Sequence, residues 1–457
     1  MMAHRQSPLL VDSLDIVCIL FLDLDVQHDF RDAENTTLAM EVRLVLCLVI
    51  FMQVLGAAVG VRPPAMYVFG DSTMDVGNNN YLPGLGVSRA NRPYYGVDYP
   101  LRIPTGRFSN GYNTADYYML AAKSMGFVSS PPAYLSLTPM SSLLAVTALS
   151  SGVSYASGGA GILDSTASPP SMSTLQASHC WIESKYNGDI SIPLSKQIQY
   201  FNGTRARMVA TLGSGAAVNA LLAKSVFLVG VGSNDMFGFA AAEQAQNRSA
   251  ADDVAAFYTS LISSYSAAIQ ELYGMGARRF AIINLGLLGC VPIVRVLDPS
   301  GSCNDGLNAL AAGFDGVLES SLAGLAAKLP GLVYSLADSY GLTVDTFADP
   351  QASGYTDVAG ACCGSGRLNA ETDCMPNSTL CANRDQLVFW DRFHPSQRAS
   401  FLTARAFYNG PSKYTTPINF MQLAAETYRD QFVFWDRYHP SQRASFLTAR
   451  AFYNGPA

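Results

Sequence analysis

Short apolar runs alternate along this chain with amphipathic helical patterns, and this alternation restricts the fold more than any other feature of the sequence. The runs 65–69, 225–231 and 280–285 are each short enough for one buried strand. Between the last two runs, apolar residues recur every three or four positions, which predicts a helix over 252–273. Strand, helix and strand in this order predict a right-handed βαβ unit and a parallel sheet. A second helical stripe over 307–329 completes the expectation of a three-layer α/β/α domain.

The composition agrees with a folded domain and argues against one class of partner. Hydrophobic residues make up 49% of the 457 residues and charged residues 14%, so the chain can bury a substantial core. Lysine and arginine do not cluster along the chain, which argues against a nucleic-acid partner. The net charge of −6 is mild and favours no particular class of partner.

Residues 40–60 have the pattern of a secretory signal peptide. A basic residue precedes an apolar run at 44–55, and small residues follow that run. The run is shorter than the roughly 20 apolar residues of a membrane span, so a membrane anchor and a buried helix are the less favoured interpretations. Because such a signal normally begins a chain, we expect Met40 to be the functional start and 1–39 to be an upstream extension. The chain is therefore predicted to be secreted, with no stable membrane insertion after cleavage of the signal.

Sequons and cysteines agree with an extracellular protein. Glycosylation sequons begin at Asn202, Asn247 and Asn377. Four cysteines crowd into 362–381, a segment rich in glycine and asparagine, which favours a disulfide-bonded loop formed in an oxidising compartment. A zinc site is the alternative, but the paired Cys-x-x-Cys spacing is absent. The number of cysteines after the signal is odd, with Cys180 isolated from the rest: Cys180, Cys290, Cys303, Cys362, Cys363, Cys374 and Cys381.

A direct repeat is the least usual feature of the chain. The segment 430–456 repeats 385–411 with only two differences, Leu387/Phe432 and Phe393/Tyr438. A solenoid would need at least three units, and their sequences would have diverged. The near-identity indicates a recent duplication or an error in assembling the coding sequence.

A candidate nucleophile follows the first apolar run. Ser72 comes directly after Gly70 and Asp71, and a polar, turn-rich segment at 73–80 follows it. Ligands bind at this edge of an open α/β sheet, so Ser72 is expected to face a cleft. The alternative is a serine that merely caps a helix.

A serine nucleophile needs a base, and this chain has few histidines. His4 and His28 precede the expected mature start, whereas His179, His394 and His439 follow it. His394 and His439 each follow an aspartate by three residues, Asp391 and Asp436 respectively. That spacing lets the carboxylate bind one ring nitrogen while the other ring nitrogen faces the serine.

Acyl transfer also needs hydrogen-bond donors for the developing oxyanion. Asn234 follows the second predicted strand within the polar turn 232–235, a position equivalent to that of Ser72. The small-residue turn 157–161 can offer backbone N–H groups, Gly158 among them. A turn-forming asparagine and an ordinary glycine loop are the alternatives.

Together these segments resemble the GDSL esterase/lipase family of SGNH hydrolases, in its large plant branch. The resemblance extends from about Met40 to Ala425. It implies a flavodoxin-like sandwich without the lid of α/β-hydrolases, and neither a metal nor a cofactor. The nucleophile block matches 69–80, the glycine block 156–161, the Gly-x-Asn-Asp block 232–235 and the Asp-x-x-His block 391–394, while 104–111 and 361–364 are typical of the plant branch.

The resemblance assigns a role to each matching residue. Ser72 would attack the ester carbonyl, His394 would take its proton, and Asp391 would orient and stabilise the imidazolium. The oxyanion would be held by the N–H groups of Ser72 and Gly158 and by the side chain of Asn234. These roles imply a secreted carboxylic-ester hydrolase acting on lipid esters or on acylated plant metabolites or polymers. An acyltransferase that uses the same acyl-enzyme and a non-catalytic binding protein are the alternatives.

The family has a single Asp-x-x-His block, whereas this chain has two. The segment 417–425 resembles the ordinary family ending, and it follows the first copy. We therefore expect 61–425 to form the hydrolase domain with His394 as its base, and 426–457 to be an appendage that carries Asp436 and His439. Substrate choice is expected to depend on the loops 129–151 and 165–186, whose composition names no substrate.

Overall fold

The computed structural model describes residues 63–121, 130–167, 190–246 and 251–425. The predicted signal peptide, His179, Cys180 and Asn247 lie outside these ranges. So does the second copy of the repeat, with Asp436 and His439.

A mostly parallel sheet forms the centre of the described domain. β1 (Met66–Gly70), β2 (Val226–Gly230), β3 (Arg279–Ile283) and β4 (Val333–Ala337) run parallel in that order, and β9 (Thr415–Thr416) pairs antiparallel with β4. All three strands that the apolar runs predict are present, with ends shifted by one or two residues.

A short extended segment lies on the other side of β1 and completes the strand order. The Val68 N–H donates to the Val153 carbonyl at 3.1 Å, and the Tyr155 N–H donates to the Val68 carbonyl at 2.7 Å. This segment, 153–155, follows β1 in the sequence but lies on the side of β1 away from β2, and Ser154 bridges in turn to Ala133. When β1, the segment 153–155, β2, β3 and β4 are numbered 1 to 5 by their place in the sequence, they lie side by side in the order 2-1-3-4-5. This is the flavodoxin order, and it reverses between β1 and β2.

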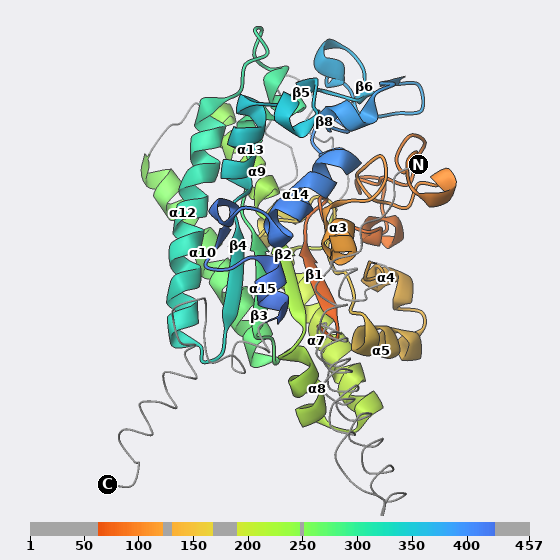
Figure 1. Ribbon diagram of the computed structural model, residues 1–457, viewed down its shortest axis with the longest axis vertical. Coiled ribbons are helices and arrows are strands. Elements are labelled where there is room, and N and C mark those ends of the chain that lie inside the picture. The colour runs from red at the N-terminus through yellow and green to blue at the C-terminus, as the bar shows by residue number, and fades with distance from the viewer. Residues whose placement is uncertain (1–62, 122–129, 168–189, 247–250, 426–457) are drawn as a thin grey trace, which may run out of the picture. The chain divides into compact units, whose positions relative to one another are not determined.

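Helices cover both faces of the sheet because alternate side chains of the strands point to opposite faces. Tyr67 and Phe69 of β1 lie in a core cluster on one side, together with residues of α7 (Leu194–Leu212), α10 (Ala251–Gly274) and α12 (Asp305–Lys328). Met66 and Val68 pack on the other side with α3 (Thr114–Ala121), α14 (Gln397–Asn409) and α15 (Phe420–Ala425). Figure 1 shows the three layers, and the predicted α/β/α architecture is confirmed.

The predicted helices 252–273 and 307–329 correspond to α10 and α12, but two other expectations are wrong. The segment 129–151, expected as a loop, contains α4 (Tyr134–Leu137) and α5 (Ser141–Ser150). Asn234 lies in the first turn of a helix, α9 (Ser233–Gln246), rather than in a free turn. The remaining helical elements are α6 (Asp164–Ala167), α8 (Gly215–Leu222), α11 (Pro292–Arg295), α13 (Ser339–Ala348) and the 3₁₀ turns η2 (Asn78–Tyr81), η3 (Pro100–Arg102), η5 (Leu288–Cys290), η6 (Gln351–Ser353), η7 (Arg367–Asn369), η8 (Arg384–Gln386) and η9 (Ser412–Tyr414).

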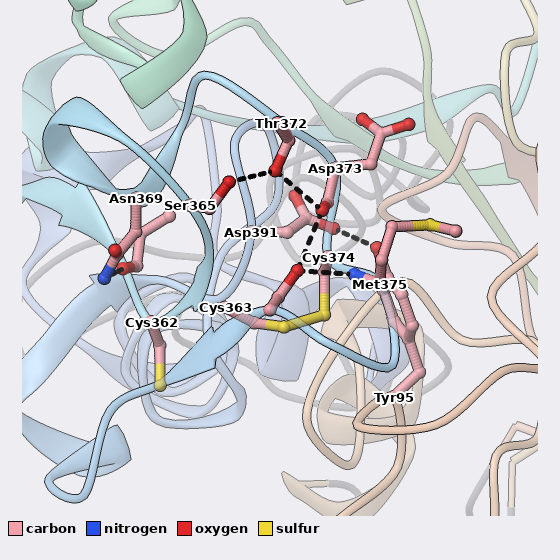
Figure 2. Close-up of a disulfide and its surroundings, with 12 residues drawn as sticks. Tyr95, Cys362, Cys363, Ser365, Asn369, Thr372, Asp373, Cys374, Met375 and Asp391 are labelled. Carbon is pink, nitrogen blue, oxygen red and sulfur yellow. Dashed lines mark hydrogen bonds between the residues drawn. A yellow bond between two sulfur atoms is a disulfide. The ribbon is translucent and has the colours of Figure 1, made fainter.

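A disulfide-bonded module adjoins the last helices of the domain. β5 (Asp357–Ala361) pairs in parallel with β8 (Leu387–Phe389), and β6 (Cys363–Gly364) pairs antiparallel with β7 (Thr379–Leu380). The prediction of disulfides is confirmed, and the zinc alternative is wrong because all four clustered sulfurs are bonded in pairs. Figure 2 shows one of these bridges, between Cys363 and Cys374. The bridges join Cys290 to Cys303, Cys362 to Cys381 and Cys363 to Cys374.

In the described ranges, no helix is both long enough and apolar enough to cross a bilayer. The same ranges contain no group of three histidine, cysteine, aspartate or glutamate side chains arranged to hold a metal ion.

Candidate active site

Ser72 lies just beyond the carboxyl end of β1, next to the point where the strand order reverses. A Cβ atom on Gly70 would lie 2.4 Å from the Gly230 carbonyl oxygen, so only glycine allows β1 and β2 to end this close together. The side chain of Gln197 holds this end, accepting from the Gly70 N–H at 2.9 Å and donating to the Gly70 carbonyl at 2.8 Å. The chain then turns out of the sheet and presents Ser72, half-buried, at the ligand-binding edge.

Asp391 and His394 lie in the loop between β8 and α14. The Oδ1 atom of Asp391 accepts the backbone N–H groups of Phe393 at 2.8 Å and His394 at 2.9 Å. The Trp390 N–H donates to the His394 carbonyl at 2.8 Å and closes the loop. These bonds fold the chain back on itself, which explains how an aspartate and a histidine three residues apart bring their side chains together.

The three side chains form a continuous hydrogen-bonded series. Ser72 Oγ lies 2.8 Å from His394 Nε2, and His394 Nδ1 lies 2.8 Å from both carboxylate oxygens of Asp391. With a proton on Nδ1 facing the carboxylate, Nε2 is free to accept the serine proton. The sequence separation between Ser72 and His394 is 322 residues, so the fold brings together residues that the sequence only suggested.

Burial of the carboxylate shapes its chemistry. Asp391 is 2% exposed and His394 is 9% exposed. Burial alone would raise the pKa of the Asp391 carboxyl, but the His394 imidazole and the backbone N–H donors outweigh burial and hold this pKa below its usual value. Asp391 is therefore ionised at neutral pH and can stabilise a positive charge on His394.

Two aromatic residues that the sequence reasoning did not single out complete the surroundings of this pair. The Tyr95 hydroxyl donates to Asp391 Oδ2 at 2.8 Å. The Phe108 ring lies against the His394 ring, with centroids 4.8 Å apart. Phe108 belongs to the segment 104–111, which is typical of the plant branch, so that segment was a usable signal. No pattern marked Tyr95, which lies 296 residues from Asp391 in the sequence.

The three predicted oxyanion donors differ in their partners. The Ser72 N–H makes no hydrogen bond to any other described residue. The Asn234 side-chain amide donates one hydrogen to the Ala160 carbonyl at 2.9 Å, which leaves its second hydrogen available. The Gly158 N–H donates to Asp75 Oδ2 at 3.1 Å, so its one hydrogen already has an acceptor. The use of these donors during catalysis stays a prediction.

Two buried aspartates hold the donor loops at this edge. Asp75 accepts the N–H groups of Gly77 at 2.7 Å and Asn78 at 2.6 Å in addition to that of Gly158. Asp235, next to Asn234, accepts the Ile162 N–H at 2.8 Å and thus holds the end of the glycine turn. Burial raises the pKa of each of the two carboxyls to about 6, although these N–H donors oppose the shift.

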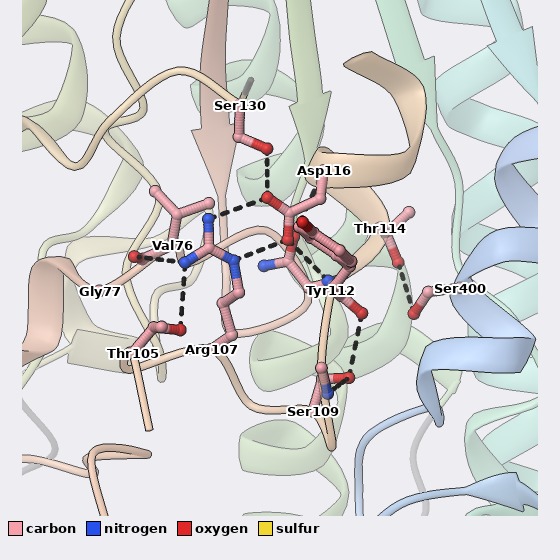
Figure 3. A network of polar contacts seen from close by, with 12 residues as sticks. Val76, Gly77, Thr105, Arg107, Ser109, Tyr112, Thr114, Asp116, Ser130 and Ser400 are labelled. Atoms are coloured by element: carbon pink, nitrogen blue, oxygen red, sulfur yellow. Dashed lines mark hydrogen bonds and ion pairs between the residues drawn. The ribbon is translucent and has the colours of Figure 1, made fainter. Parts of the chain in front are cut away.

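A buried ion pair joins the segment 104–111 to α3, and its arginine also contacts the turn after Ser72. Arg107 Nε lies 2.6 Å from Asp116 Oδ2, and Arg107 Nη2 lies 2.9 Å from Asp116 Oδ1, so the pair is bidentate. Figure 3 shows the same guanidinium reaching the Val76 carbonyl, four residues after Ser72, at 3.3 Å. The pair therefore fixes the nucleophile turn relative to α3, which carries Asp116.

Comparison with known proteins identifies the family. The model of the family described as GDSL-like Lipase/Acylhydrolase matches residues 66–407. This chain belongs to the GDSL-like lipase/acylhydrolase family. The family is one of ester hydrolases, and the plant resemblance read from the sequence is confirmed.

The GDSL relatives span most of this chain. It is 35% identical to the GDSL esterase/lipase At5g55050 of Arabidopsis thaliana over 79% of this chain and 90% of the relative. It is 34% identical to the GDSL esterase/lipase LTL1 of the same plant, again over 79% of this chain and 90% of the relative. A solved lipase from a goat rumen metagenome, Lip_vut3, aligns with 44% of this chain and 70% of its own at a TM-score of 0.24 and 12% identity, too low to bear on the fold.

Proposed function

We propose that this GDSL hydrolase cleaves carboxylic esters through an acyl-enzyme on Ser72, with His394 as general base and Asp391 as the carboxylate that orients it. The observation that carries this proposal is the series of 2.8 Å contacts from Ser72 Oγ through the imidazole to the Asp391 carboxylate. A serine hydroxyl is a weak nucleophile at neutral pH unless a base takes its proton, and this arrangement supplies the base.

Each half of the reaction uses the same groups. As Ser72 Oγ bonds to the ester carbonyl, its proton passes to His394 Nε2, and the carbonyl oxygen becomes an oxyanion. Collapse of this intermediate expels the alcohol, which takes the proton from His394. Water then attacks the acyl-enzyme by the same route and releases the acid. The Ser72 N–H and the second amide hydrogen of Asn234 are the donors best able to bind the oxyanion, because neither is committed to another acceptor in the described residues.

Labelling with a fluorophosphonate tests the nucleophile directly. We expect the purified wild-type protein to be labelled stoichiometrically, and Ser72→Ala to be neither labelled nor able to hydrolyse p-nitrophenyl esters. Ser233→Ala is a matched control, because Ser233 is also a half-buried serine just beyond a strand end but makes no hydrogen bond to His394 among the described residues. Equal labelling of Ser72→Ala and wild type would refute the proposal, and so would an unlabelled wild-type protein.

Replacing the two candidate histidines separately tests which copy of the repeat supplies the general base for Ser72. His394→Ala should lower kcat by a factor of about 10⁴ or more, as loss of a triad member does. His439→Ala should leave kcat and KM unchanged. Loss of turnover only in His439→Ala would assign the base to the second copy instead.

The substrate class is proposed as an ester of a lipid or of an acylated plant metabolite or polymer. The relatives At5g55050 and LTL1 are named as esterases or lipases, which supports an ester bond but names no acyl group. A series of p-nitrophenyl esters of increasing acyl length, each assayed with and without an added alcohol, addresses the acyl preference. The same assay separates hydrolysis from acyl transfer, since a transferase would form the new ester in preference to the free acid.

We also propose that the chain is secreted after cleavage of a signal peptide within 40–60. Three disulfides support an oxidising compartment. Asn377 is exposed, as a glycan acceptor must be. Amino-terminal sequencing of protein recovered from the medium should give a start near residue 61, and an endoglycosidase should lower its apparent mass. Retention of the full-length, unglycosylated chain inside the cell would contradict this.

A further inference from the structure

The Asp391 carboxylate has one hydrogen-bond donor that the Ser–His–Asp series does not need. Tyr95 donates its hydroxyl to Asp391 Oδ2 at 2.8 Å, the same distance at which that oxygen lies from His394 Nδ1. We propose that Tyr95 is a positioning residue that fixes the rotation of the Asp391 carboxylate and takes up part of its negative charge, and so sets the basicity of His394. This inference rests on the proposed function.

The position of the Tyr95 hydroxyl is determined by packing. Tyr95 is 4% exposed, and its ring meets Phe108 and Trp390 edge-on, with centroids 6.3 Å and 6.1 Å away. These rings form one small core with the disulfide-bonded cysteines of the 362–381 module. Figure 2 shows Tyr95 reaching Asp391 beside the Cys363–Cys374 bridge. A side chain packed in this way on several sides holds its hydroxyl against the carboxylate without a further entropic cost.

Asp391 needs such a fixed donor because its other contacts do not determine its rotation fully. The imidazole lies 2.8 Å from both carboxylate oxygens, so it does not distinguish between them. Oδ1 also accepts the N–H groups of Phe393 and His394, whereas Tyr95 provides a donor to Oδ2. With both oxygens bound, the carboxylate plane is held against the imidazole.

The charged groups near this pair make the tyrosine a permanent donor. Burial raises the pKa of the Tyr95 phenol well above its usual value, and the Asp391 charge raises this pKa further. The Arg92 guanidinium lies over the Tyr95 ring, 5.4 Å from its centroid, and opposes that shift. Asp71, whose carboxylate accepts from Thr73, interacts electrostatically with His394, and Arg392 pairs with Asp373 at 3.3 Å. The hydroxyl therefore keeps its proton at neutral pH and can donate it to the carboxylate.

The sign of the effect of Tyr95 follows from this arrangement. A hydrogen bond from Tyr95 lowers the charge that Asp391 presents to the imidazolium, and so lowers the proton affinity of His394. Removing the hydroxyl should raise that affinity and loosen the carboxylate. The acid limb of the kcat/KM profile reports the ionisation of the base in the free enzyme, so it should move to higher pH.

The experiment compares Tyr95→Phe with Tyr118→Phe in the full chain. Tyr118 is also buried, but its hydroxyl has no partner among the described residues and lies in the core cluster with Phe420. In Tyr95→Phe we expect kcat to fall about tenfold, the order of one charge-assisted hydrogen bond, with KM unchanged. The acid limb should rise by about half a pH unit or more. Tyr118→Phe should change neither quantity.

A graded variant keeps the test informative if Tyr95→Phe folds poorly. 3-Fluorotyrosine incorporated at position 95 has a more acidic phenol and is a stronger donor, so the acid limb should move to lower pH while the melting temperature stays the same. An acid limb that moves in neither Tyr95 variant would overturn the inference, whatever the change in rate, because a merely structural role would not shift it. If the acid limb does not move but the wild type is active and labelled by the fluorophosphonate, only the role of Tyr95 is refuted and the proposed function is retained. If the wild type is not labelled, the proposed function itself is refuted.

Discussion

At the scale of single residues, the charge on Asp391 decides which nitrogen of His394 carries a proton. In Asp391→Asn, the amide fills the same space and can donate to Nδ1, which would hold the proton on Nε2 and leave no lone pair for the Ser72 hydroxyl. We therefore expect kcat to fall by a factor of about 10³–10⁴ while the melting temperature changes little. Steady-state kinetics on a p-nitrophenyl ester, with thermal unfolding of the same samples, measure both quantities.

Asp373→Asn is the matched control for that substitution. Asp373 lies in the same region and pairs with Arg392 at 3.3 Å, but its side chain is 57% exposed and does not touch His394. The Asp373 side of this pair is exposed, and the amide oxygen of the replacement can still accept from Arg392, so kcat and stability should both stay close to those of the wild type. An Asp391→Asn variant as active as this control would show that no carboxylate is needed beside His394.

Individual residues of the site could be predicted where chemistry restricts the choice, and not where only packing does. Ser72, Asp391 and His394 are distinguished by residue type, spacing and position after a strand, and the structure brings all three together. Tyr95 escapes such reasoning because a tyrosine between another tyrosine and a glycine has no distinctive pattern, and its role depends on a partner supplied by a distant loop. The bond from Gly158 to Asp75 was missed for a similar reason, since a backbone N–H leaves no trace in the sequence.

At the scale of elements, α12 carries a buried acid whose ionisation affects folding. Asp315 Oδ1 accepts the Leu285 N–H at 3.0 Å, just beyond β3, while Oδ2 has no partner among the described residues. Burial, and secondarily the Asp338 charge, raise the pKa of Asp315 from 3.8 to about 8. The folded state thus keeps a proton that the unfolded chain loses above about pH 4. The free energy of unfolding should therefore fall as pH rises from about 4 towards 8.

Asp315→Asn removes this dependence while keeping the acceptor for the Leu285 N–H. At pH 7 the variant should be more stable than wild type by about 2 kcal/mol, and its stability should vary less between pH 5 and pH 8. Urea unfolding at several pH values measures both effects. Asp305→Asn, at the exposed first turn of the same helix, should change stability by only about 0.5 kcal/mol. Parallel stability curves for Asp315→Asn and wild type across this pH range would show that Asp315 is ionised in the folded state.

The elements that could be predicted are those whose apolar pattern reflects a single packing surface. α10 places its inward residues at helical spacing, and the strands β1 to β3 are continuous apolar runs buried on both faces. α5 was missed because it exposes Leu143 and Val146 while burying Leu144 and Ala148, so its apolar residues mark no single face. The segment 153–155 was missed because three residues are too few to show a period, although its place beside β1 gives the sheet its strand order.

At the scale of the whole molecule, the first copy of the repeat is integrated into the domain. Its β8 pairs with β5, its loop supplies Asp391 and His394, and its α14 packs against α3. The chain then continues through β9, at the edge of the main sheet, to α15, which covers β3 and β4. A second copy could supply a base only by displacing elements that already carry these contacts. Because these contacts are already made by the first copy, we expect only one of the two histidines to act as the general base for Ser72.

A truncation series tests whether residues 426–457 contribute to the active site or to folding. Protein ending at Ala425 should match the full chain in kcat, KM and melting temperature, because the contacts that complete the sheet are made before that point. Protein ending at Asn419 should not fold stably, because it loses the buried side chains of Phe420 and Leu423 and the 2.9 Å bond from Arg279 to the Ala424 carbonyl. Burying two such side chains contributes several kcal/mol, at roughly 2 kcal/mol each, a large fraction of the stability of a typical domain. If the protein ending at Ala425 were folded but inactive, residues 426–457 would have to supply part of the active site, and the base would then be His439 rather than His394.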